Sequence, residues 1–435
     1  MVKALLFIKV QQEEHVNRFI IDDISPYTLK PVFDIKNITG FLIDEVNLNC
    51  DGIKQKSPDA MANATAFSYP YKALEQQIFD SKDQCGLIKQ LFEFREKPLS
   101  KEEEEFPLAY GILVFRRPSQ VLFQMSAFYE PQNEYCLAVS ANAKPRFKTV
   151  MKSLGDCFPN IHVLDRPVIH WGKFEIINST YACMEEVYRK AKRPWKYFQY
   201  LAGVDAPLKS NYEMVQIFKA LNGTVNTEIK YFQPARLLEK KIEDAPIKLW
   251  KSSLSALIPY EAAKTIVESS LSRKVLNFID GTYVPDESFW GSMTGNPGIF
   301  PVAGSVNSSG WLRFLTRRKT YLKKVRNETE AEGRMRSYLS RYQIWNENCE
   351  GKLVSGSCVF GSAHLGRLLT QPQLVAHKFN IEYQPAVYFC VLKEIRNRSL
   401  KAISTVDVKK YQQIPQVELQ NGVAFENLTH PEWML

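Results

Sequence analysis

Eight cysteines constrain this chain more than any other feature of its sequence. The 435 residues also hold eight Asn-x-Ser/Thr sequons. Neither pattern is specific alone, because cytosolic enzymes contain buried thiols and sequons recur by chance. No two cysteines have Cys-x-x-Cys zinc-site spacing and the six histidines are scattered, so together the patterns favour a disulfide framework formed in an oxidising, glycosylating compartment. The cysteines are Cys50, Cys85, Cys136, Cys157, Cys183, Cys349, Cys358 and Cys390, and the sequon asparagines are Asn37, Asn63, Asn178, Asn222, Asn307, Asn327, Asn397 and Asn427.

The composition is that of a globular protein, and the length of 435 residues allows roughly two or three domains. Apolar residues make up 45% of the chain and charged residues 24%, which are ordinary values. The net charge of +9 fits an anionic ligand such as a nucleotide diphosphate, and it fits a solvated surface equally well. No nucleic-acid-binding motif is present, so nucleic acid is disfavoured as a partner. Nothing in the sequence indicates the oligomeric state.

The N-terminus does not explain how the chain would reach that compartment. Residues 1–10 contain one apolar run, residues 4–8, which is too short for a signal-peptide core or a membrane span. No later stretch approaches a membrane span. We therefore expect that a leader or anchor is missing from this sequence or that entry uses a signal not visible in it.

Beyond residue 106 the sequence predicts an α/β fold. Residues 1–106 are mixed and turn-rich, and their acidic end, residues 101–105, is typical of a solvated linker. After it, apolar runs alternate with helix-like segments, which indicates a mostly parallel sheet with helices on both faces. The predicted strands are 108–115, 135–140, 160–164 and 197–204. The first predicted helix follows the first strand and ends at about residue 129, and the others are 147–154 and 177–190.

The ends of these strands indicate where a ligand binds. Sheets of this kind bind ligands outside the carboxyl ends of their strands. This places a site near residues 114–117, residues 140–142 and Asp205. No Gly-x-Gly-x-x-Gly or Walker motif occurs, so dinucleotide and phosphate-loop sites are not predicted.

Four stretches carry a resemblance to a known family. They are PLAYGILVF with FYEPQNEYCLAVS, then WKYFQYLAGVDAPLKSNYEM at 195–214, YVPDESFW at 283–290, and CVFGSAHLGRLL with AHKF at 358–379. Together they resemble the core-2/I-branching β-1,6-N-acetylglucosaminyltransferase family, whose superfamily also holds peptide O-xylosyltransferases. The resemblance covers about residues 85–395 and includes all eight cysteines in order.

The resemblance implies a Rossmann-like glycosyltransferase fold of the A type, stapled by disulfides, in the Golgi lumen or membrane. It also implies an inverting reaction without metal or other cofactor, in agreement with the absence of Asp-x-Asp from the sequence. We expect an N-terminal, stem-like region over 1–106, a glycosyltransferase domain over 107–395 and a C-terminal extension over 396–435. Within the domain, about 107–250 would bind nucleotide and about 251–395 acceptor. The implied disulfides are Cys50–Cys390, Cys85–Cys157, Cys136–Cys183 and Cys349–Cys358.

Glu287 is the strongest catalytic candidate. It stands in Pro285-Asp286-Glu287 at the position of the family's catalytic glutamate, where a carboxylate would take the proton of an acceptor hydroxyl. Without the resemblance, this tripeptide is simply a good first turn of a helix. Lys378 matches the family's phosphate-contacting lysine, which would hold the diphosphate by charge-assisted hydrogen bonds. Taken alone, such a lysine is usually a solvated partner of a helix end.

The other site residues follow from the same resemblance. Glu228, Arg236 and, at a similar offset, Lys240 are predicted to orient the acceptor sugar, and Tyr342 and Trp345 to present aromatic faces to it. The predicted donor-binding residues are Leu113, Val114, Phe115, Ser140, Trp171 and Lys378, with Trp171 in place of a family tyrosine.

Two substitutions depart from the family pattern. Ser140 stands where the family has a donor-binding aspartate, and Ser355 where it has a diphosphate-contacting arginine. Each loss removes a charged hydrogen bond worth about 1.5–3 kcal/mol. Lys352 and Arg367 are candidates to supply the missing positive charge.

The predicted reaction moves N-acetylglucosamine from UDP to the 6-hydroxyl of a galactose or N-acetylgalactosamine on an O-glycan. The partners are therefore a UDP-sugar and an O-glycan or glycoprotein acceptor. Xylose transfer to a proteoglycan serine is an enzymatic alternative. A catalytically weakened, lectin-like glycan-binding protein is the alternative from another class, and it would bind glycan without UDP.

Overall fold

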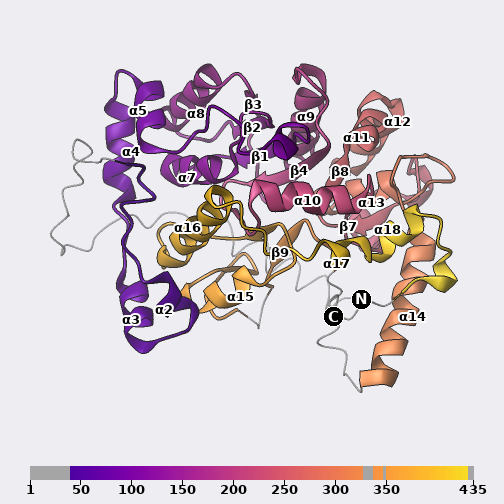
Figure 1. Cartoon of the computed structure of the whole chain (residues 1–435). Coiled ribbons are helices and arrows are strands. Elements are labelled where there is room, and N and C mark those ends of the chain that lie inside the picture. Colours follow the sequence, from indigo (N-terminus) through magenta and orange to yellow (C-terminus); the bar gives the residue numbers. More distant parts are fainter. Residues whose placement is uncertain (1–39, 327–336, 346–348, 430–435) are drawn as a thin grey trace. The chain divides into compact units, whose positions relative to one another are not determined.

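A five-stranded sheet forms the centre of the protein, in the order β3-β2-β1-β4-β8. The computed structural model describes residues 40–326, 337–345 and 349–429, so the N-terminal run discussed above lies outside the described residues. Strands β1 to β4 are parallel and β8 is antiparallel to β4. The five labels follow one another in this order across Figure 1. The strands are β1 (Ala109–Val114), β2 (Glu134–Ser140), β3 (Ile161–Arg166), β4 (Tyr197–Ala202) and β8 (Leu257–Pro259).

The helices between these strands confirm the predicted alternation. They are α7 (Pro118–Phe128), α8 (Pro145–Cys157), α9 (Glu175–Lys190) and α10 (Asn211–Leu221). Three further helices follow β8: α11 (Tyr260–Glu268), α12 (Ser270–Ile279) and α13 (Phe289–Thr294). Strands β1 and β2 are buried along their whole length, as expected for a sheet covered on both faces. The predicted fold class is correct.

Residues on alternate sides of β1 pack against different helices. Tyr110 lies in contact with Met214 of α10, through its hydroxyl, on one face. Gly111 lies on the other face and pairs with Cys136 of β2. A Cβ atom at position 111 would lie 3.0 Å from Cβ of Cys183 on α9. The glycine therefore leaves room for the disulfide that joins β2 to α9.

All four disulfides implied by the family resemblance are present. The bonds are Cys50–Cys390, Cys85–Cys157, Cys136–Cys183 and Cys349–Cys358, with Cα atoms 5.3 to 5.6 Å apart. These separations are ordinary for disulfides. Cys50–Cys390 joins α2 (Cys50–Lys54) to α16 (Ala386–Leu400), and Cys85–Cys157 joins α5 (Gln84–Leu91) to α8. The N-terminal helices are thus covalently attached to the central fold.

The N-terminal helices are α2 (Cys50–Lys54), α3 (Pro58–Ala66), α4 (Tyr71–Asp80), α5 (Gln84–Leu91) and α6 (Lys101–Glu104). The acidic run predicted to be a solvated linker is instead a capped helix, α6. Glu103 is buried and accepts a hydrogen bond from Asn211 of α10 at 2.8 Å. This interpretation was wrong because an acidic run offers partners to polar groups far away in the sequence, which charge patterning does not reveal.

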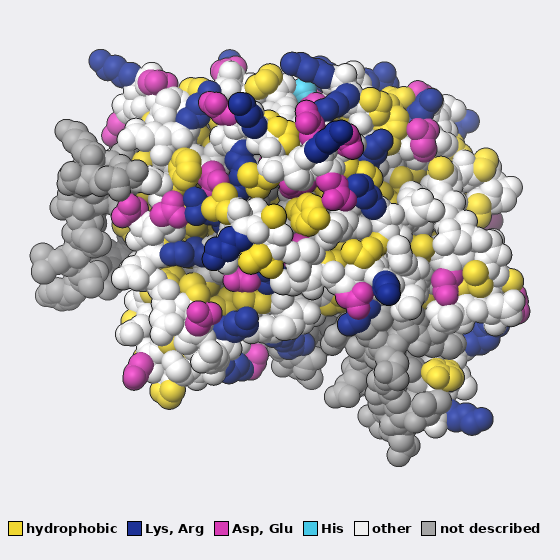
Figure 2. All heavy atoms as spheres, viewed as in Figure 1, with side chains coloured by type: hydrophobic (Ala, Val, Ile, Leu, Met, Phe, Trp, Pro, Cys, Tyr) yellow, Lys and Arg dark blue, Asp and Glu magenta, His cyan; other side chains and the backbone are white. Residues whose placement is uncertain are grey.

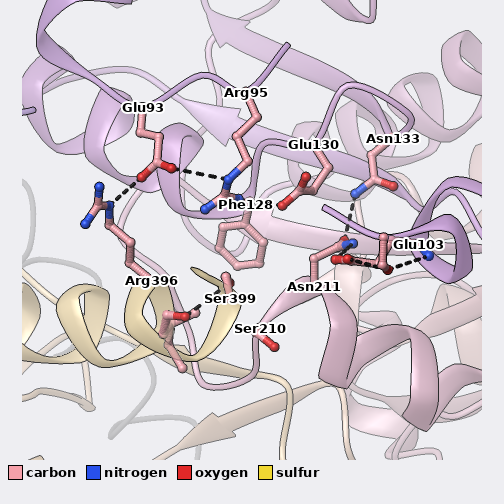
Figure 3. A network of polar contacts seen from close by, with 12 residues as sticks. Glu93, Arg95, Glu103, Phe128, Glu130, Asn133, Ser210, Asn211, Arg396 and Ser399 are labelled. Atoms are coloured by element: carbon pink, nitrogen blue, oxygen red, sulfur yellow. Dashed lines mark hydrogen bonds and ion pairs between the residues drawn. The ribbon is translucent and has the colours of Figure 1, made fainter. Parts of the chain in front are cut away.

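A polar network continues from there to α16 (Figure 3). Arg95 lies between two carboxylates, 3.3 Å from Glu93 and 2.5 Å from Glu130. Glu93 also pairs with Arg396 of α16 (Ala386–Leu400). Because burial and the loss of hydration disfavour its charge, the pKa of Glu130 is raised to about 7, although Arg95 opposes the shift. Buried charges with such partners fix the segment before β1 against α16.

Smaller sheets complete the fold on the carboxyl side of β4. They are β5-β12-β9, the hairpin β10-β11 and the pair β6-β7. The remaining elements are β5 (Ala206–Pro207), β6 (Ile229–Tyr231), β7 (Trp250–Ser252), β9 (Arg341–Gln343), β10 (Lys352–Val354), β11 (Ser357–Val359), β12 (Val375–His377), α14 (Ser308–Arg326), α15 (Leu365–Leu369), α17 (Val408–Gln412) and α18 (Pro415–Gln420).

The surface carries both signs of charge. On the face in Figure 2, basic and acidic side chains are interspersed with apolar ones. Within the described part of the chain, every helix is too short or too polar to cross a bilayer.

Candidate functional site

The carboxyl ends of β1 and β4 meet at the point where the strand order reverses. From β1 the chain adds β2 and β3 on one side, and then α9 returns it to β4 on the other side of β1. Such a switch point is where open α/β sheets bind their ligands. At this edge Leu113 and Val114 are buried, whereas the next residue, Phe115, is 47% exposed. Of these predicted donor residues, Phe115 is the one with an accessible ring.

Ser140, at the end of β2, uses its hydroxyl within the fold. It donates to Oδ1 of Asn142 at 2.6 Å and accepts from the backbone N–H of Ile169 at 2.8 Å. The loop held in this way carries Trp171, whose side chain is 65% exposed. A Cβ atom on the adjacent Gly172 (φ +69°) would lie 3.7 Å from a methyl of Val284. The Trp171 loop therefore lies against the turn that leads to Glu287.

Glu287 ends a short 3₁₀ turn, η4 (Pro285–Glu287), and is held by two cations. Arg236 Nη2 lies 2.6 Å and Lys251 Nζ lies 3.2 Å from the same carboxylate oxygen, Oε2. Arg236 is itself fixed, because its Nε donates to Gln233 Oε1 at 2.7 Å. The carboxylate is 27% exposed, and no residue of the described ranges bonds to Oε1. That oxygen is the one placed to accept a proton.

The neighbouring carboxyl, Asp286, faces the interior instead. Its residue is only 7% exposed. Burial, and secondly the negative charge of Glu287, raise the pKa of Asp286 to about 7. Of the two adjacent acids, Glu287 is the one that an acceptor can reach.

The antiparallel pair β6-β7 extends this charged surface. Lys230 of β6 lies directly opposite Lys251 of β7, so their side chains lie on the same face. Glu228 pairs with Lys230 at 2.6 Å. We call Glu228, Lys230, Arg236, Lys251 and Glu287 the charged cluster. It brings together three residues predicted from the sequence, Glu228, Arg236 and Glu287.

Lys378 directly follows β12. Its Nζ donates to the carbonyl of Val354 at 2.8 Å, which places the ammonium beside the β10-β11 turn that contains Ser355. Burial, followed by the positive charge of Arg116, lowers the pKa of Lys378 to about 8. An anion that approaches Lys378 would therefore stabilise the charged form of its ammonium group.

A buried triad of Asp205, Arg341 and His377 lies directly before Lys378 in the fold. Asp205, just beyond β4, accepts from His377 Nδ1 at 2.6 Å through Oδ1. Its Oδ2 accepts from Arg341 at 3.2 Å and from the N–H of Ala202 at 2.8 Å. Burial opposes the charge of Asp205, but Arg341 and then His377 outweigh it and hold the pKa of Asp205 below its usual value. His377 directly precedes Lys378, so the triad fixes the backbone from which that lysine projects.

The remaining predicted residues lie farther from the charged cluster or have other partners. Tyr342, on β9, stacks on Phe360 with ring centroids 5.9 Å apart. Trp345 is 40% exposed and forms a β-bridge with Ser357 of the β10-β11 hairpin. These aromatics therefore gather near the Lys378 side of the site. Lys240 donates to the carbonyls of Phe278 and Asp280, so it caps the end of α12.

Four of these residues were not predicted from the sequence: Lys230, Lys251, Arg341 and His377. Lys251 reaches Glu287 through the ladder of β6 and β7, and these strands of three residues each are too short to show a period. Arg341 and His377 form the triad from positions 136 and 172 residues away from Asp205. The strand-end rule pointed to Asp205, but it gave no signal for these partners.

The described residues contain no group of three or more His, Cys, Asp and Glu side chains placed to hold a metal ion.

A mostly parallel sheet with an accessible carboxylate and several cations near the carboxyl ends of its strands suits the binding of an anionic ligand. Comparison with known proteins gives the family. The chain belongs to the core-2/I-branching enzymes, because that family's model matches residues 108–329. Its members are glycosyltransferases, so this chain is classed as an enzyme of that kind.

Relatives with assigned activities cover most of the chain. It is 25% identical to mouse beta-1,3-galactosyl-O-glycosyl-glycoprotein beta-1,6-N-acetylglucosaminyltransferase 4, over 82% of this chain and 81% of that protein. The human transferase 3 of the same name is 26% identical over 81% of this chain and 84% of its own length. Human N-acetyllactosaminide beta-1,6-N-acetylglucosaminyl-transferase is 27% identical over 71% of this chain and 76% of that protein.

Proposed function

We propose that this protein transfers N-acetylglucosamine from UDP to the 6-hydroxyl of a galactose or N-acetylgalactosamine on an O-glycan. The observation that carries the proposal is the Glu287 carboxylate, which is accessible through Oε1 and oriented by Arg236 and Lys251. The names of the relatives, which are beta-1,6-N-acetylglucosaminyltransferases, support the sugar and the linkage.

The proposed step is a single displacement. The acceptor oxygen forms a bond to the anomeric carbon while the bond from that carbon to the β-phosphate oxygen breaks. The proton of the hydroxyl passes to Glu287 Oε1, and the electron pair of the breaking bond leaves with UDP. Attack opposite the leaving group inverts the anomeric configuration.

Lys378 stabilises the charge that develops on the departing diphosphate. Side chains alone supply this charge in the proposed reaction, without metal or cofactor.

The acceptor sugar would lie over the charged cluster. Glu228 and Arg236 offer, respectively, an acceptor and a donor of hydrogen bonds to its hydroxyl groups. Trp345 and Tyr342 provide aromatic faces, and Trp171 and Phe115 flank the donor. Four disulfides suit an oxidising compartment, so we place the enzyme in the Golgi lumen or membrane, with glycoproteins as partners.

One observation favours a second candidate, a lectin-like protein that binds glycans without turnover. The hydroxyl of Ser140 is committed to Asn142 and Ile169, and Ser355 offers no charge to a diphosphate. A protein of this kind would bind the acceptor glycan and show no affinity for UDP.

A donor screen separates the two candidates. The oxidised protein is incubated with UDP-N-acetylglucosamine, UDP-xylose and other UDP-sugars, together with O-glycan and serine-peptide acceptors, in excess EDTA. We expect mass spectrometry to detect one N-acetylglucosamine added to the glycan. Transfer of xylose to serine would contradict the proposed donor and acceptor. Glycan binding without UDP binding or product would support the lectin-like candidate.

The affinity for UDP should fall as the pH rises through 8. The lowered pKa of Lys378, about 8, means that the free protein loses this positive charge between pH 7 and 9. Because the charged form binds the diphosphate, Kd should rise by about tenfold over this interval. Calorimetric titrations at pH 7, 8 and 9 measure the change.

The control is Lys378→Arg, which stays charged over the whole range. Its Kd should vary less with pH than that of the wild type. Equal Kd values for the wild type at pH 7 and pH 9 would contradict this prediction, and an unchanged Kd in Lys378→Met at pH 7 would show that Lys378 does not bind the diphosphate.

A further inference from the structure

We infer that Arg116 is a second diphosphate-binding cation, which supplies from the end of β1 the positive charge that the family places at the position of Ser355. This inference rests on the proposed function and deepens its donor site. It follows from three features: the contacts that join two loops, the different partners of two adjacent arginines, and the way the start of α7 is capped.

The turn after β1 is joined to the loop after Lys378. The side chain of Gln120 in α7 donates to the carbonyl of Phe379 at 3.0 Å and accepts from the N–H of Ile381 at 3.2 Å. These two bonds fix residues 379–381 against the first turn of α7. Arg116 is two residues before α7 and Lys378 is one residue before this loop, so both cations lie at the same edge of the sheet.

The two arginines of this turn have different partners. Arg117 pairs with Glu382 at 2.5 Å, and its guanidinium carbon lies 5.1 Å from the centre of the Tyr71 ring. Arg116 is exposed and lies 5.0 Å from the centre of the Phe115 ring. Within residues 40–326, 337–345 and 349–429 it forms no ion pair. Arg117 therefore serves the fold, whereas Arg116 keeps its charge available to a ligand.

The backbone also distinguishes the two arginines. Arg117 has a left-handed conformation, with a φ of 58°, and is the residue directly before α7. Phe115 and Arg116 precede it, directly after the end of β1.

The N-terminus of α7 does not provide the anion site. Helix N-termini attract phosphate groups through their unpaired N–H groups. Here Glu75 Oε1 accepts from both the N–H and the hydroxyl of Ser119, at 3.3 and 2.7 Å. A buried carboxylate already occupies the position, so the diphosphate needs side-chain cations.

Arg116 and Lys378 form a pair of like charges. Burial, and after it the positive charge of Arg116, lowers the pKa of Lys378. Two neighbouring cations repel each other until an anion bridges them. A diphosphate, with negative oxygens on both phosphorus atoms, is a ligand that relieves this repulsion.

The candidates suggested by the sequence are less well placed. Arg367 lies over the Tyr342 ring, with its guanidinium carbon 5.9 Å from the ring centre. Lys352 is exposed at the start of β10, paired in the ladder with Val359. The positive charge of Arg116 lowers the pKa of Lys378, whereas Arg367 and Lys352 do not.

The test compares UDP with uridine, which shares the base and ribose but has no phosphate. Titration calorimetry on Arg116→Met should give a Kd for UDP raised by about tenfold to a hundredfold. The Kd for uridine, measured by competition, should stay unchanged. Arg193→Met is the matched control, because Arg193 is exposed just before β4, at the opposite edge of the sheet.

A gain-of-function variant guards against a folding artefact. Introducing Ser355→Arg into Arg116→Met returns a cation beside Lys378, and we expect it to recover at least tenfold in UDP affinity. Recovery requires that the fold of Arg116→Met is intact and that the loss was one of charge.

The remaining outcomes overturn the inference in distinguishable ways. If wild-type protein does not bind UDP, the proposed function and the inference fail together. If wild type binds UDP and Arg116→Met binds within twofold, the inference alone fails. An equal loss of UDP and uridine affinity, without recovery by Ser355→Arg, would assign Arg116 to the nucleoside or the fold rather than to the diphosphate.

Discussion

Replacing Glu287 by glutamine is expected to lower kcat by about 10²- to 10⁴-fold, the usual contribution of a general base. Glutamine keeps the size of the side chain and an oxygen that can accept from Arg236, but it cannot take the acceptor proton. The Kd for UDP should not change, because the charged partners of Glu287 are Arg236 and Lys251, not the proposed donor cations Lys378 and Arg116. Single-turnover kinetics and UDP titrations on the same preparation measure both quantities.

Two variants control for the loss of a negative charge. Glu261→Gln removes an exposed carboxylate on the first turn of α11 and should leave kcat unchanged. Glu228→Gln should mainly raise the KM for the acceptor, because Glu228 orients the sugar without taking its proton. If Glu287→Gln retained kcat within threefold, another group would have to be the base. If it lost UDP binding, its effect would be structural.

Most of the central sheet could be predicted because β1 and β2 are mainly apolar runs that are buried along their whole length, and β4 is buried except at its last residue. The runs at 108–115 and 197–204 match β1 and β4 to within two residues. Helix α9, predicted over 177–190, begins at Glu175 and ends at Lys190 as expected. Disulfide pairing was predicted correctly from the family resemblance, since eight cysteines have no unique pairing in spacing alone.

Long-range polar contacts could not be predicted in this way. Glu103 belongs to an acidic run that is typical of a solvated segment, but Asn211, 108 residues later, binds it in the interior. The charged partners of Glu287 illustrate the same limit, because Lys251 reaches it through a pairing of two short strands. Hydrophobic periodicity reports which face of an element is buried, and it does not report which polar groups meet there.

The candidate site was predictable where a motif carries it. Glu287 and Lys378 follow from short local sequences, and the geometry now gives each of them neighbours that suit its proposed role. Arg116 follows from neither a motif nor a period. Its charge is available to a ligand because Glu382 forms its ion pair with Arg117 and not with Arg116. Which arginine pairs with Glu382 is determined by the folded structure and cannot be predicted from the sequence.

Replacing Asp205 by asparagine is expected to cost about 3–5 kcal/mol of unfolding free energy, because it leaves Arg341 buried without its counter-ion. An asparagine also presents an NH₂ group where the carboxylate accepts from His377 or from Ala202. Urea unfolding of the oxidised protein at pH 7 measures the loss. The KM for the UDP-sugar should rise as well, since His377 positions the backbone of Lys378.

A double-mutant cycle decides whether this cost comes from the ion pair. With Arg341 replaced by methionine, Asp205→Asn should cost about 1–3 kcal/mol less than it does in the wild type, because the cation that needed it is gone. Agreement of the two costs within about 0.5 kcal/mol would mean that the sites are independent. The loss of unfolding free energy would then come from the hydrogen bonds of Asp205 to His377 and Ala202. Arg341 would not help to position Lys378.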